Sequence, residues 1–435
     1  MSLLRIMVPT SLGDVATTWP RGLIEPQRLP ELTTFGTTQP VDSLNLTRMM
    51  RLTTPARRAS TLRHVSASRR VLSSSSISTG PFKTVILNEG GSGANISLEE
   101  DILRGTSSVS VHERCTHEAE GAHGIISWRV PALGKAELDR LTSAVVISRV
   151  GVGVDSVDIK YAGELGIKVT NIPAYGTEEV ADTAMAHILN KYRRFSIAVK
   201  GVETNAVTTS ANTSTQKLCG GARRIRGERL GLIGFGRIGT AVARRAQTFG
   251  FEIGFFDPYV ADGVDRSFGG ATRYRTVEQL VEESDCISLH CTHTDETSKI
   301  LNRELLTSKI KPGCIVINTA RQGLIDDHAL GDAIRAGRID SAGLDCLASE
   351  PKLTHPFCVD EDGPFHACGD RVTVTPHCSF FSGASILDMK SMSAREVNKV
   401  LQSGTSNNIV NNAWLNLERA NSRWEQAMAN VAYHP

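Results

Sequence analysis

The feature that most constrains the fold is a glycine-rich turn that joins a short apolar segment to a helix. Residues 230–233 (Leu-Gly-Leu-Ile) have the composition of a buried strand, and they run directly into Gly234-Phe-Gly236-Arg-Ile-Gly239. A helix is predicted over 240–248, and a second strand over 251–256 ends in Asp257. A strand, a glycine turn, a helix and an acidic residue about 20 positions further on are the ordered parts of a dinucleotide-binding βαβ unit.

Each part of this segment has a physical role in binding a dinucleotide. The first glycine permits the tight turn, the second lets the backbone approach a pyrophosphate, and the third lets the helix pack on the strand. Asp257 favours NAD over NADP, because a 2′-phosphate would meet its carboxylate and neither Pro258 nor Tyr259 supplies a cation. Arg237 is expected to contact phosphate. The alternatives are a solvated surface arginine and a glycine turn without a ligand.

Alternating strand and helix patterns extend from about residue 82 to about residue 402. Further strands are predicted at 82–87, 124–128 and 144–148, and further helices at 135–141 and 178–194. Such alternation predicts βαβ units, a parallel sheet and the α/β fold class.

Polar side chains follow three more predicted strands. The apolar strand at 314–319 leads into Arg321, and the one at 371–375 leads into His377. The segment between them delivers Asp345 and, a little further on, Glu350. Ligands of open parallel sheets bind outside the carboxyl ends of the strands. We therefore expect these groups to share one crevice with the dinucleotide.

These residue types fit the reduction of a 2-oxo acid by hydride. Arg321 offers a forked cationic donor to the carboxylate and the developing alkoxide. His377 is the predicted general acid/base, because imidazole titrates near neutrality. Glu350 on the far side of the ring would raise the pKa of the imidazole and orient it. The alternative is that each of the three is an ordinary surface or core polar residue.

Composition excludes several other classes of protein. The 435 residues suffice for two or three domains, and 40% hydrophobic and 22% charged residues are usual for a soluble globular protein. A net charge of +2 gives no support for direct nucleic-acid binding. No apolar run approaches the ~18 residues of a membrane span, so no membrane association is expected.

The cysteines indicate a reducing compartment and no metal site. There are nine, an odd number, and none forms a C-x-x-C pair. One cluster deserves comparison with metal sites, but its spacing matches no standard zinc signature. Its members are Cys358, His366, Cys368, His377 and Cys378.

The first 80 or so residues differ from the rest of the chain. They are rich in Ser, Thr and Arg, and no acidic residue occurs from Ser43 to Asn88. This composition predicts a disordered arm, because it cannot bury enough apolar surface to offset chain entropy. An acid-poor, Arg-rich and Ser-rich stretch is also typical of a mitochondrial presequence, although this one begins well downstream of Met1.

Over about residues 82–412 the chain resembles the D-isomer-specific 2-hydroxyacid dehydrogenases. Within that family it is most similar to the C-terminal-binding protein branch, whose members are NAD-sensing transcriptional corepressors. Beyond the residues discussed above, the segments that carry the resemblance are 149–155, 171–173, 187–194, 221–227, 256–259 and 289–291.

The resemblance implies a Rossmann-type NAD-binding domain inserted into a split flavodoxin-like substrate domain. The NAD domain would comprise 178–381 and the substrate domain 82–177 and 382–412, with 1–81 a disordered or targeting arm and 413–435 a tail. The resemblance also implies a homodimer and the identity of the site residues. The catalytic residues would be Arg321, Glu350 and His377; the cofactor would contact Gly234, Gly236, Arg237, Ile238, Gly239, Asp257, Cys291, Thr319 and, through its nicotinamide amide, Asp345; and the substrate would contact Arg149, Gly151, Gly153 and Phe380.

Three departures from the family pattern affect the substrate pocket. Gln322 stands where the family usually has the first of two glycines after the arginine, and it is expected to narrow or redirect the pocket. Phe380 replaces the tryptophan of the corepressor branch, which keeps an aromatic wall but removes the indole donor. The segment 352–370 is also longer than usual.

Two functions follow as hypotheses. The first is an NAD-dependent dehydrogenase that acts on a small 2-oxo or 2-hydroxy acid. The second is a corepressor-like protein that uses NAD(H) mainly to stabilise its dimer and that binds transcription-factor peptides. A cytoplasmic or nuclear location is expected, with mitochondria as the alternative that the N-terminal composition leaves open.

Overall fold

The computed structural model describes residues 80–88, 95–115, 117–128, 132–204, 216, 218–346 and 363–432. All of them lie in the compact unit that spans Ser74–Pro435. Of the sequence predictions, nearly all of the arm at 1–81 falls outside the described residues. Glu350 and most of the long segment at 352–370 fall outside them too.

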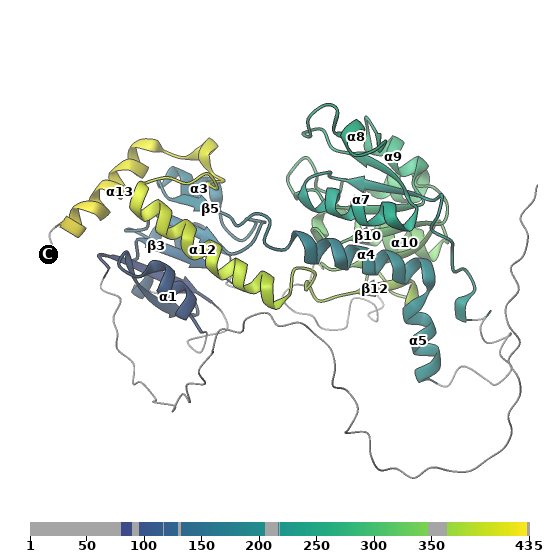
Figure 1. Cartoon of the computed structure of the whole chain (residues 1–435), viewed down its shortest axis with the longest axis horizontal. Coiled ribbons are helices and arrows are strands. Elements are labelled where there is room, and N and C mark those ends of the chain that lie inside the picture. The colour runs from purple at the N-terminus through teal and green to yellow at the C-terminus, as the bar shows by residue number, and fades with distance from the viewer. Residues whose placement is uncertain are drawn as a thin grey trace, which may run out of the picture. The chain divides into compact units, whose positions relative to one another are not determined.

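The first sheet in the described chain is five-stranded and parallel (Figure 1). Its strand order is β2-β1-β3-β4-β5, which is the flavodoxin-like order. The strands are β1 (Phe82–Leu87), β2 (Ser107–His112), β3 (Gly124–Ser127), β4 (Val146–Arg149) and β5 (Lys168–Thr170).

Helices cover both faces of this sheet, because its side chains alternate between two apolar clusters. Ile86 packs into one cluster, and its neighbours Val85 and Leu87 pack into the other. The helices are α1 (Ser97–Leu103), α2 (Lys135–Arg140), α3 (Ile159–Glu164), α12 (Gly383–Ser403) and α13 (Leu417–Ala432). Although α12 comes late in the chain, it packs against β3, β4 and α1.

The second sheet is seven-stranded and parallel, with the order β12-β11-β10-β9-β6-β7-β8. Counted from β6, its first six strands in sequence lie in the order 3-2-1-4-5-6, which is the Rossmann order. The strands are β6 (Arg229–Ile233), β7 (Glu252–Phe256), β8 (Thr272–Arg273), β9 (Cys286–Leu289), β10 (Cys314–Asn318), β11 (Ile339–Leu344) and β12 (Val372–Val374).

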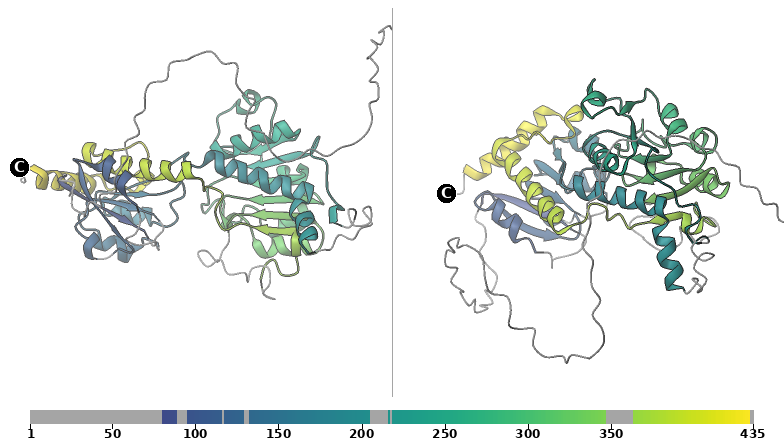
Figure 2. Two further views of the ribbon diagram at one scale, coloured as in Figure 1. Left: turned by 60° about the horizontal axis from the view of Figure 1, so that its bottom comes forward. Right: turned by 45° about the vertical axis from the view of Figure 1, so that its right-hand side comes forward.

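Helices α4 (Thr177–Arg193) and α7 (Arg237–Phe249) pack side by side on one face of the second sheet (Figures 1 and 2). Arg245 joins them, since it donates to Asp182 and Glu178 of α4 at 2.6 Å each. The carboxylates also lie near the N-terminus of α4, where they favourably oppose the helix dipole. Further helices among the described residues of this domain are α5 (Phe195–Glu203), α8 (Val264–Ser267), α9 (Val277–Glu283) and α10 (Asp327–Arg335).

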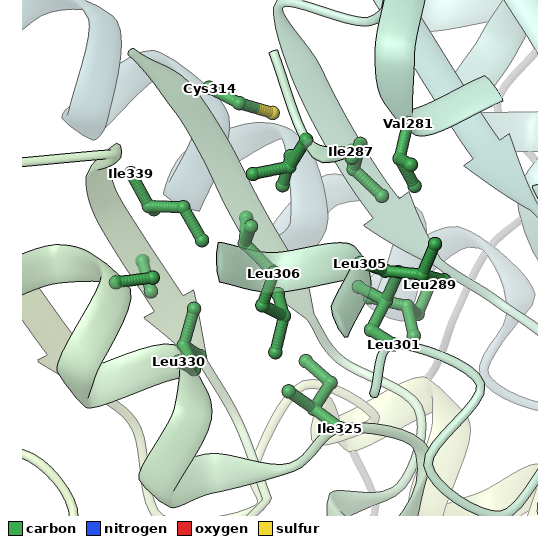
Figure 3. Close-up of a cluster of buried hydrophobic side chains, with 14 of the residues drawn as sticks. Val281, Ile287, Leu289, Leu301, Leu305, Leu306, Cys314, Ile325, Leu330 and Ile339 are labelled. Atoms are coloured by element: carbon green, nitrogen blue, oxygen red, sulfur yellow. The ribbon is translucent and has the colours of Figure 1, made fainter. Parts of the chain in front are cut away.

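The opposite face of the second sheet is covered by a large apolar cluster (Figure 3). Ile287 and Leu289 of β9 meet α9, α10 and the short helical turn η2 (Leu305–Lys309) there. Leu306 of that turn and Leu330 of α10 are fully buried. This rigid packing supports the strand ends that carry the polar residues predicted above.

The predicted fold class is confirmed. A Rossmann-type domain interrupts a flavodoxin-like domain, because α12 and α13 follow the second sheet in sequence and complete the first domain. The domain boundaries stay predictions. Residues 417–432, part of the segment predicted as a tail, form α13, in which the indole of Trp424 donates to the carbonyl of Leu401 at 3.0 Å. None of the described helices is both long and apolar enough to cross a bilayer.

Candidate active site

The glycine turn lies between β6 and α7, and two of its glycines are required by close packing. Gly234 has a φ of +93°, and a Cβ there would lie 2.6 Å from the backbone nitrogen of Cys291. A Cβ at Gly239 would lie 2.2 Å from the carbonyl oxygen of Gly234. The turn can therefore close, and α7 can approach the strand, only without side chains at these positions.

Gly236 differs from the other two, because a Cβ there would meet no atom within 4 Å. It is the N-cap of α7 and supplies no side-chain cap, so the first amides of α7 point into an open space. A cavity of about 520 Å³ occupies this space. Arg237 and Arg244 are among its lining residues, which also include Ala174, Thr177, Glu178, Thr240 and Ala241. Helix amides and two cations in one hollow fit a pyrophosphate.

Asp257 follows β7 and faces the turn. Its carboxylate accepts from the backbone nitrogens of Phe235 at 2.8 Å and Tyr259 at 2.9 Å. The guanidinium of Arg273 lies nearby, but it is bonded to Asp262 at 3.1 Å and to the carbonyls of Asp257 and Val260 at 3.0 Å each. Asp257 thus retains acceptor capacity for ribose hydroxyls.

Buried polar atoms beside the turn also fit a bound cofactor. The hydroxyl of Thr319, just after β10, is buried and has no partner among the described residues. The same holds for Nδ1 of His290, which follows β9, and burial lowers the pKa of that ring to about 3. Burial raises the pKa of Cys291 to about 11, so its thiol stays protonated. Ile238 is half-buried in the first turn of α7.

Arg321 is presented by a turn at the carboxyl end of β10. Asn318 shapes the turn, since its side chain donates to the carbonyl of Arg321 at 2.7 Å and accepts from Ala320 N at 3.0 Å. The guanidinium donates from Nη1 to the Ala320 carbonyl at 2.8 Å and from Nε to Asp155 at 3.4 Å. Burial alone would raise the pKa of Asp155, but Arg321 and, less strongly, Arg149 outweigh it and lower that pKa.

Two guanidinium groups meet the loop that follows β4. A Cβ at Gly151 would lie 1.5 Å from Nη1 of Arg149, and a Cβ at Gly153 would lie 2.0 Å from Nη2 of Arg321. The absence of side chains at these glycines therefore makes room for both arginines. Burial and the nearby Arg321 lower the pKa of Arg149, and its buried Nε has no partner among the described residues. Such a pair would be stabilised by an anion.

Asp345, at the end of β11, holds the turn that carries His377. It is 1% exposed, and its carboxylate accepts from the Thr375 hydroxyl and from the backbone nitrogens of Cys378 at 3.1 Å and Ser379 at 2.8 Å. His377 lies between these donors with a φ of +49°, in the left-handed region. The structure thus places Asp345 under the turn, where its oxygens keep one lone pair for a further donor.

Phe380 links His377 to the end of the first domain. Its ring meets the ring of His377 at 6.3 Å and the ring of Tyr175 at 6.2 Å, both edge to face. Burial raises the pKa of Tyr175, while Arg149 and Arg321 oppose that rise, so its phenol lies near both arginines. Glu350, the third predicted catalytic residue, lies outside the described residues.

Gln322 is directed to a carboxylate. Its amide donates to Asp327 at 2.9 Å, across the turn between Arg321 and α10. Burial raises the pKa of Asp327 to about 6, although the bond from Gln322 opposes the rise. The side chain that was expected to alter the substrate pocket is therefore held by the start of α10.

Sequence reasoning did not single out Tyr175, Asp327 or the buried His187 of α4. His187 is bonded to Thr375 at 3.2 Å, directly beneath the His377 turn. A polar residue within the apolar stripe formed by Ala184 and Ile188 was the signal available in the sequence. Among the described residues, no group of three or more His, Cys, Asp or Glu is placed to hold a metal ion.

Comparison with known proteins supports the resemblance to the 2-hydroxyacid dehydrogenases. The model of the D-isomer specific 2-hydroxyacid dehydrogenase NAD-binding domain matches residues 185–379. C-terminal-binding protein 1 of Caenorhabditis elegans is 33% identical over 318 residues, which are 71% of this chain and 42% of that protein. D-3-phosphoglycerate dehydrogenase of Mycobacterium leprae is 34% identical over 252 residues, which are 58% of this chain and 43% of that protein.

The chain thus spans less than half the length of each of these two curated relatives. Among solved structures, D-lactate dehydrogenase of Aquifex aeolicus, complexed with NAD and lactic acid, superimposes with a TM-score of 0.63. The two sequences are 26% identical, and the match covers 73% of this chain and 95% of that one. The resemblance to the family and the expected NAD-binding domain are confirmed.

Because a Cβ at Gly236 would meet open space, a substitution there should change the affinity for NADH without changing the stability of the fold. Gly236→Ala is expected to lower the affinity for NADH by at least about 10-fold, because the methyl group occupies the approach to the pyrophosphate. Its melting temperature should match that of the wild type, since φ is −74° and nothing lies near the new Cβ. NADH fluorescence titration and thermal unfolding measure the two quantities. Gly234→Ala is the contrasting control and should unfold at lower temperature; unchanged NADH affinity in Gly236→Ala would refute this placement of the cofactor.

The raised pKa of Asp327 predicts a pH-dependent gain in stability for Asp327→Asn. The folded protein keeps this proton up to about pH 6, whereas an unfolded aspartate loses it near pH 4. The folded state is therefore destabilised as pH rises through that window, and by a constant amount above it. Asparagine removes this loss, which amounts to at most roughly 3 kcal/mol at neutral pH.

Urea unfolding of wild type and Asp327→Asn at about pH 4 and about pH 7.5 tests this expectation. The gain should be present at the higher pH and nearly absent at the lower. Asp326→Asn is the matched control, because the backbone bond from Ala329 lowers the pKa of Asp326 and no such gain is expected. Equal gains for Asp327→Asn at both pH values would contradict the assignment.

Proposed function

We propose that this chain, which resembles the D-isomer specific 2-hydroxyacid dehydrogenases, is an NAD-dependent oxidoreductase that interconverts a 2-oxo acid and a D-2-hydroxy acid. The observation that carries the proposal is the order of strands in the second sheet. Strands β12, β11, β10 and β9 are neighbours beside β6, so the residues that follow them share one edge with the glycine turn. Arg321, Asp345 and His377 all follow strands of this set.

Arg321 is the proposed substrate clamp. Its Nη1 and Nε already have partners, and the weak 3.4 Å contact with Asp155 leaves the guanidinium able to reorient toward a substrate carboxylate. Arg149 is the second proposed cation, because its buried Nε has no acceptor among the described residues and a substrate carboxylate could provide one. Phe380 would form an apolar wall of the same pocket.

His377 is the proposed general acid in reduction and general base in oxidation, with Glu350 as its partner. NAD(H), when bound, would accept or supply the hydride. His377 would deliver the proton to the carbonyl oxygen, and Arg321 would stabilise the negative charge that develops there. Asp345 is the proposed acceptor for the nicotinamide amide, through the lone pair that the His377 turn does not use.

His377→Ala tests this assignment. Turnover is expected to fall by ~10²-fold or more, because proton transfer to the carbonyl oxygen loses its donor. NADH affinity should stay within about 2-fold, since the ring is not part of the nucleotide turn. The loss of NADH absorbance with a panel of 2-oxo acids measures turnover. Cys378→Ala, which alters the exposed neighbouring side chain, is the control and should remain active. Equal turnover in His377→Ala would overturn the role of this residue.

A second candidate function is a corepressor-like binding protein that senses NAD(H) and takes transcription-factor peptides. It is favoured by the extent of the match to C-terminal-binding protein 1, which covers 71% of this chain against 58% for the phosphoglycerate dehydrogenase. The two functions are compatible, because intact catalytic groups do not exclude a binding role.

A homodimer is proposed for both functions, with α5 in the interface. This helix projects from the second domain (Figures 1 and 2). It carries Phe195 at 67% exposure, Val199 at 40% and Val202 at 66%. The three side chains recur at intervals of four and three residues, so they form one apolar stripe. Such a stripe on a protruding helix is typical of a protein–protein contact.

Charge on this stripe is expected to dissociate the dimer. The double variant Phe195→Glu, Val202→Glu should elute as the 47.0 kDa monomer in size-exclusion chromatography with light scattering. Leu387→Glu also introduces a glutamate in place of an exposed apolar side chain, on α12, and should leave the dimer intact. A wild type that is monomeric at all concentrations would exclude the homodimer. A dimer fraction that rises with NADH would support the second candidate function.

A further inference from the structure

The turn that carries His377 rests on a buried chain of hydrogen bonds that begins in α4. His187 is 5% exposed, and its Nε2 lies 3.2 Å from the hydroxyl of Thr375. That hydroxyl donates to the carboxylate of Asp345. The same carboxylate accepts from the backbone nitrogens of Cys378 and Ser379. One continuous path therefore runs from α4 to both residues that follow His377.

The directions of these bonds determine which nitrogen of His187 carries the proton. The hydroxyl of Thr375 donates its one hydrogen to Asp345, so this hydroxyl can only accept a hydrogen bond from His187. Nε2 of His187 must then be protonated. Its Nδ1 lies 3.4 Å from the hydroxyl of Thr373, which can donate to it. Burial lowers the pKa of His187, in keeping with a neutral ring that donates on one side and accepts on the other.

The sequence around the ring makes room for it. Gly343 of β11 lies under the imidazole, and a Cβ there would be 2.8 Å from Nδ1 of His187. A side chain at position 343 would displace the ring from between Thr373 and Thr375. The strand and the helix are thus shaped to seat this one side chain, which is more than a general core position requires.

The His377 turn needs such support. A non-glycine residue at a φ of +49° is in a sparsely populated conformation, whose energetic cost must be offset by the surrounding contacts. Asp345 accepts from the backbone nitrogens of Cys378 and Ser379, the two residues after His377. It also accepts from the hydroxyl of Thr375, two residues before His377. Asp345 therefore holds the turn from both sides.

We propose that His187 is a positioning residue for His377, acting through the Thr375 hydroxyl and the Asp345 carboxylate. The expected effect of His187 on turnover rests on the proposed function. The structural consequence, a turn fixed at Cys378 and Ser379, stands independently of any reaction.

His187→Leu breaks the chain of bonds while preserving an apolar filling of the site. Amide exchange of the peptide that contains Cys378 and Ser379, followed by mass spectrometry of the cofactor-free protein, is expected to accelerate by at least about 10-fold. Turnover should fall by about 10-fold or more, while KM for the 2-oxo acid and NADH affinity stay within about 2-fold. His187→Gln, which keeps a donor in reach of Thr375, should restore most of both properties.

Thr375→Val removes the same link without altering α4. In this background, His187→Leu should cause little further change, because both variants break one chain. Met185→Leu is the control for packing, since Met185 is a similarly buried neighbour on α4 that lies outside the chain of bonds.

Unchanged exchange at Cys378 and Ser379 in His187→Leu would overturn the proposal, and so would an equal acceleration in Met185→Leu. Additive effects of His187→Leu and Thr375→Val would also overturn it, because they would show two independent roles. Accelerated exchange in His187→Leu, with no turnover in the wild type, would support the positioning of the turn while overturning the dehydrogenase assignment.

Discussion

All strands of the second sheet run in the same direction, and the candidate site depends on that constraint. Parallel strands end at one edge, so residues far apart in the chain meet there without any local signal. The glycine turn follows β6, Arg321 follows β10, Asp345 follows β11 and His377 follows β12. Strands β6, β10 and β11 are largely buried, and β6 and β10 pack apolar side chains on both faces. The carboxyl edge of the second sheet therefore gives rigid support to the polar side chains that follow its strands.

Much of this frame could be predicted from the sequence, because apolar runs and glycine turns are local signals. The strands at 230–233 and 314–319 and the helix at 178–194 were placed within two residues of β6, β10 and α4. The helices α5 and α13 were not predicted. The apolar stripe of α5 is exposed, and the segment that contains α13 was predicted as a tail. Periodicity indicates which face of an element is apolar, but not what covers it.

The polar contacts could not be predicted, since they depend on packing between elements. Gln322 was expected to face the substrate pocket, but the nearby carboxylate of Asp327 accepts its amide hydrogen. Asp345 was expected to serve the cofactor, and the structure shows that it also binds three donors around His377. His187 lies in a helical stripe that the sequence marks only as buried. In each case the residue type was known, and its partner came from a different element.

The conformation of His377 connects these observations. A side chain that must reach a reacting atom is placed on a turn rather than in a strand, and here the turn has a positive φ. That conformation persists only where surrounding contacts over-determine it. A buried carboxylate can stabilise this conformation, because a backbone donor without an acceptor in the interior is costly.

The Asp345 carboxylate must itself be held in one orientation, which the Thr375 hydroxyl and then His187 can supply. A network of this kind must be satisfied at every member to be stabilising. This requirement accounts for a histidine, a threonine and a glycine packed together beneath the turn, where three apolar residues would have filled the space equally well.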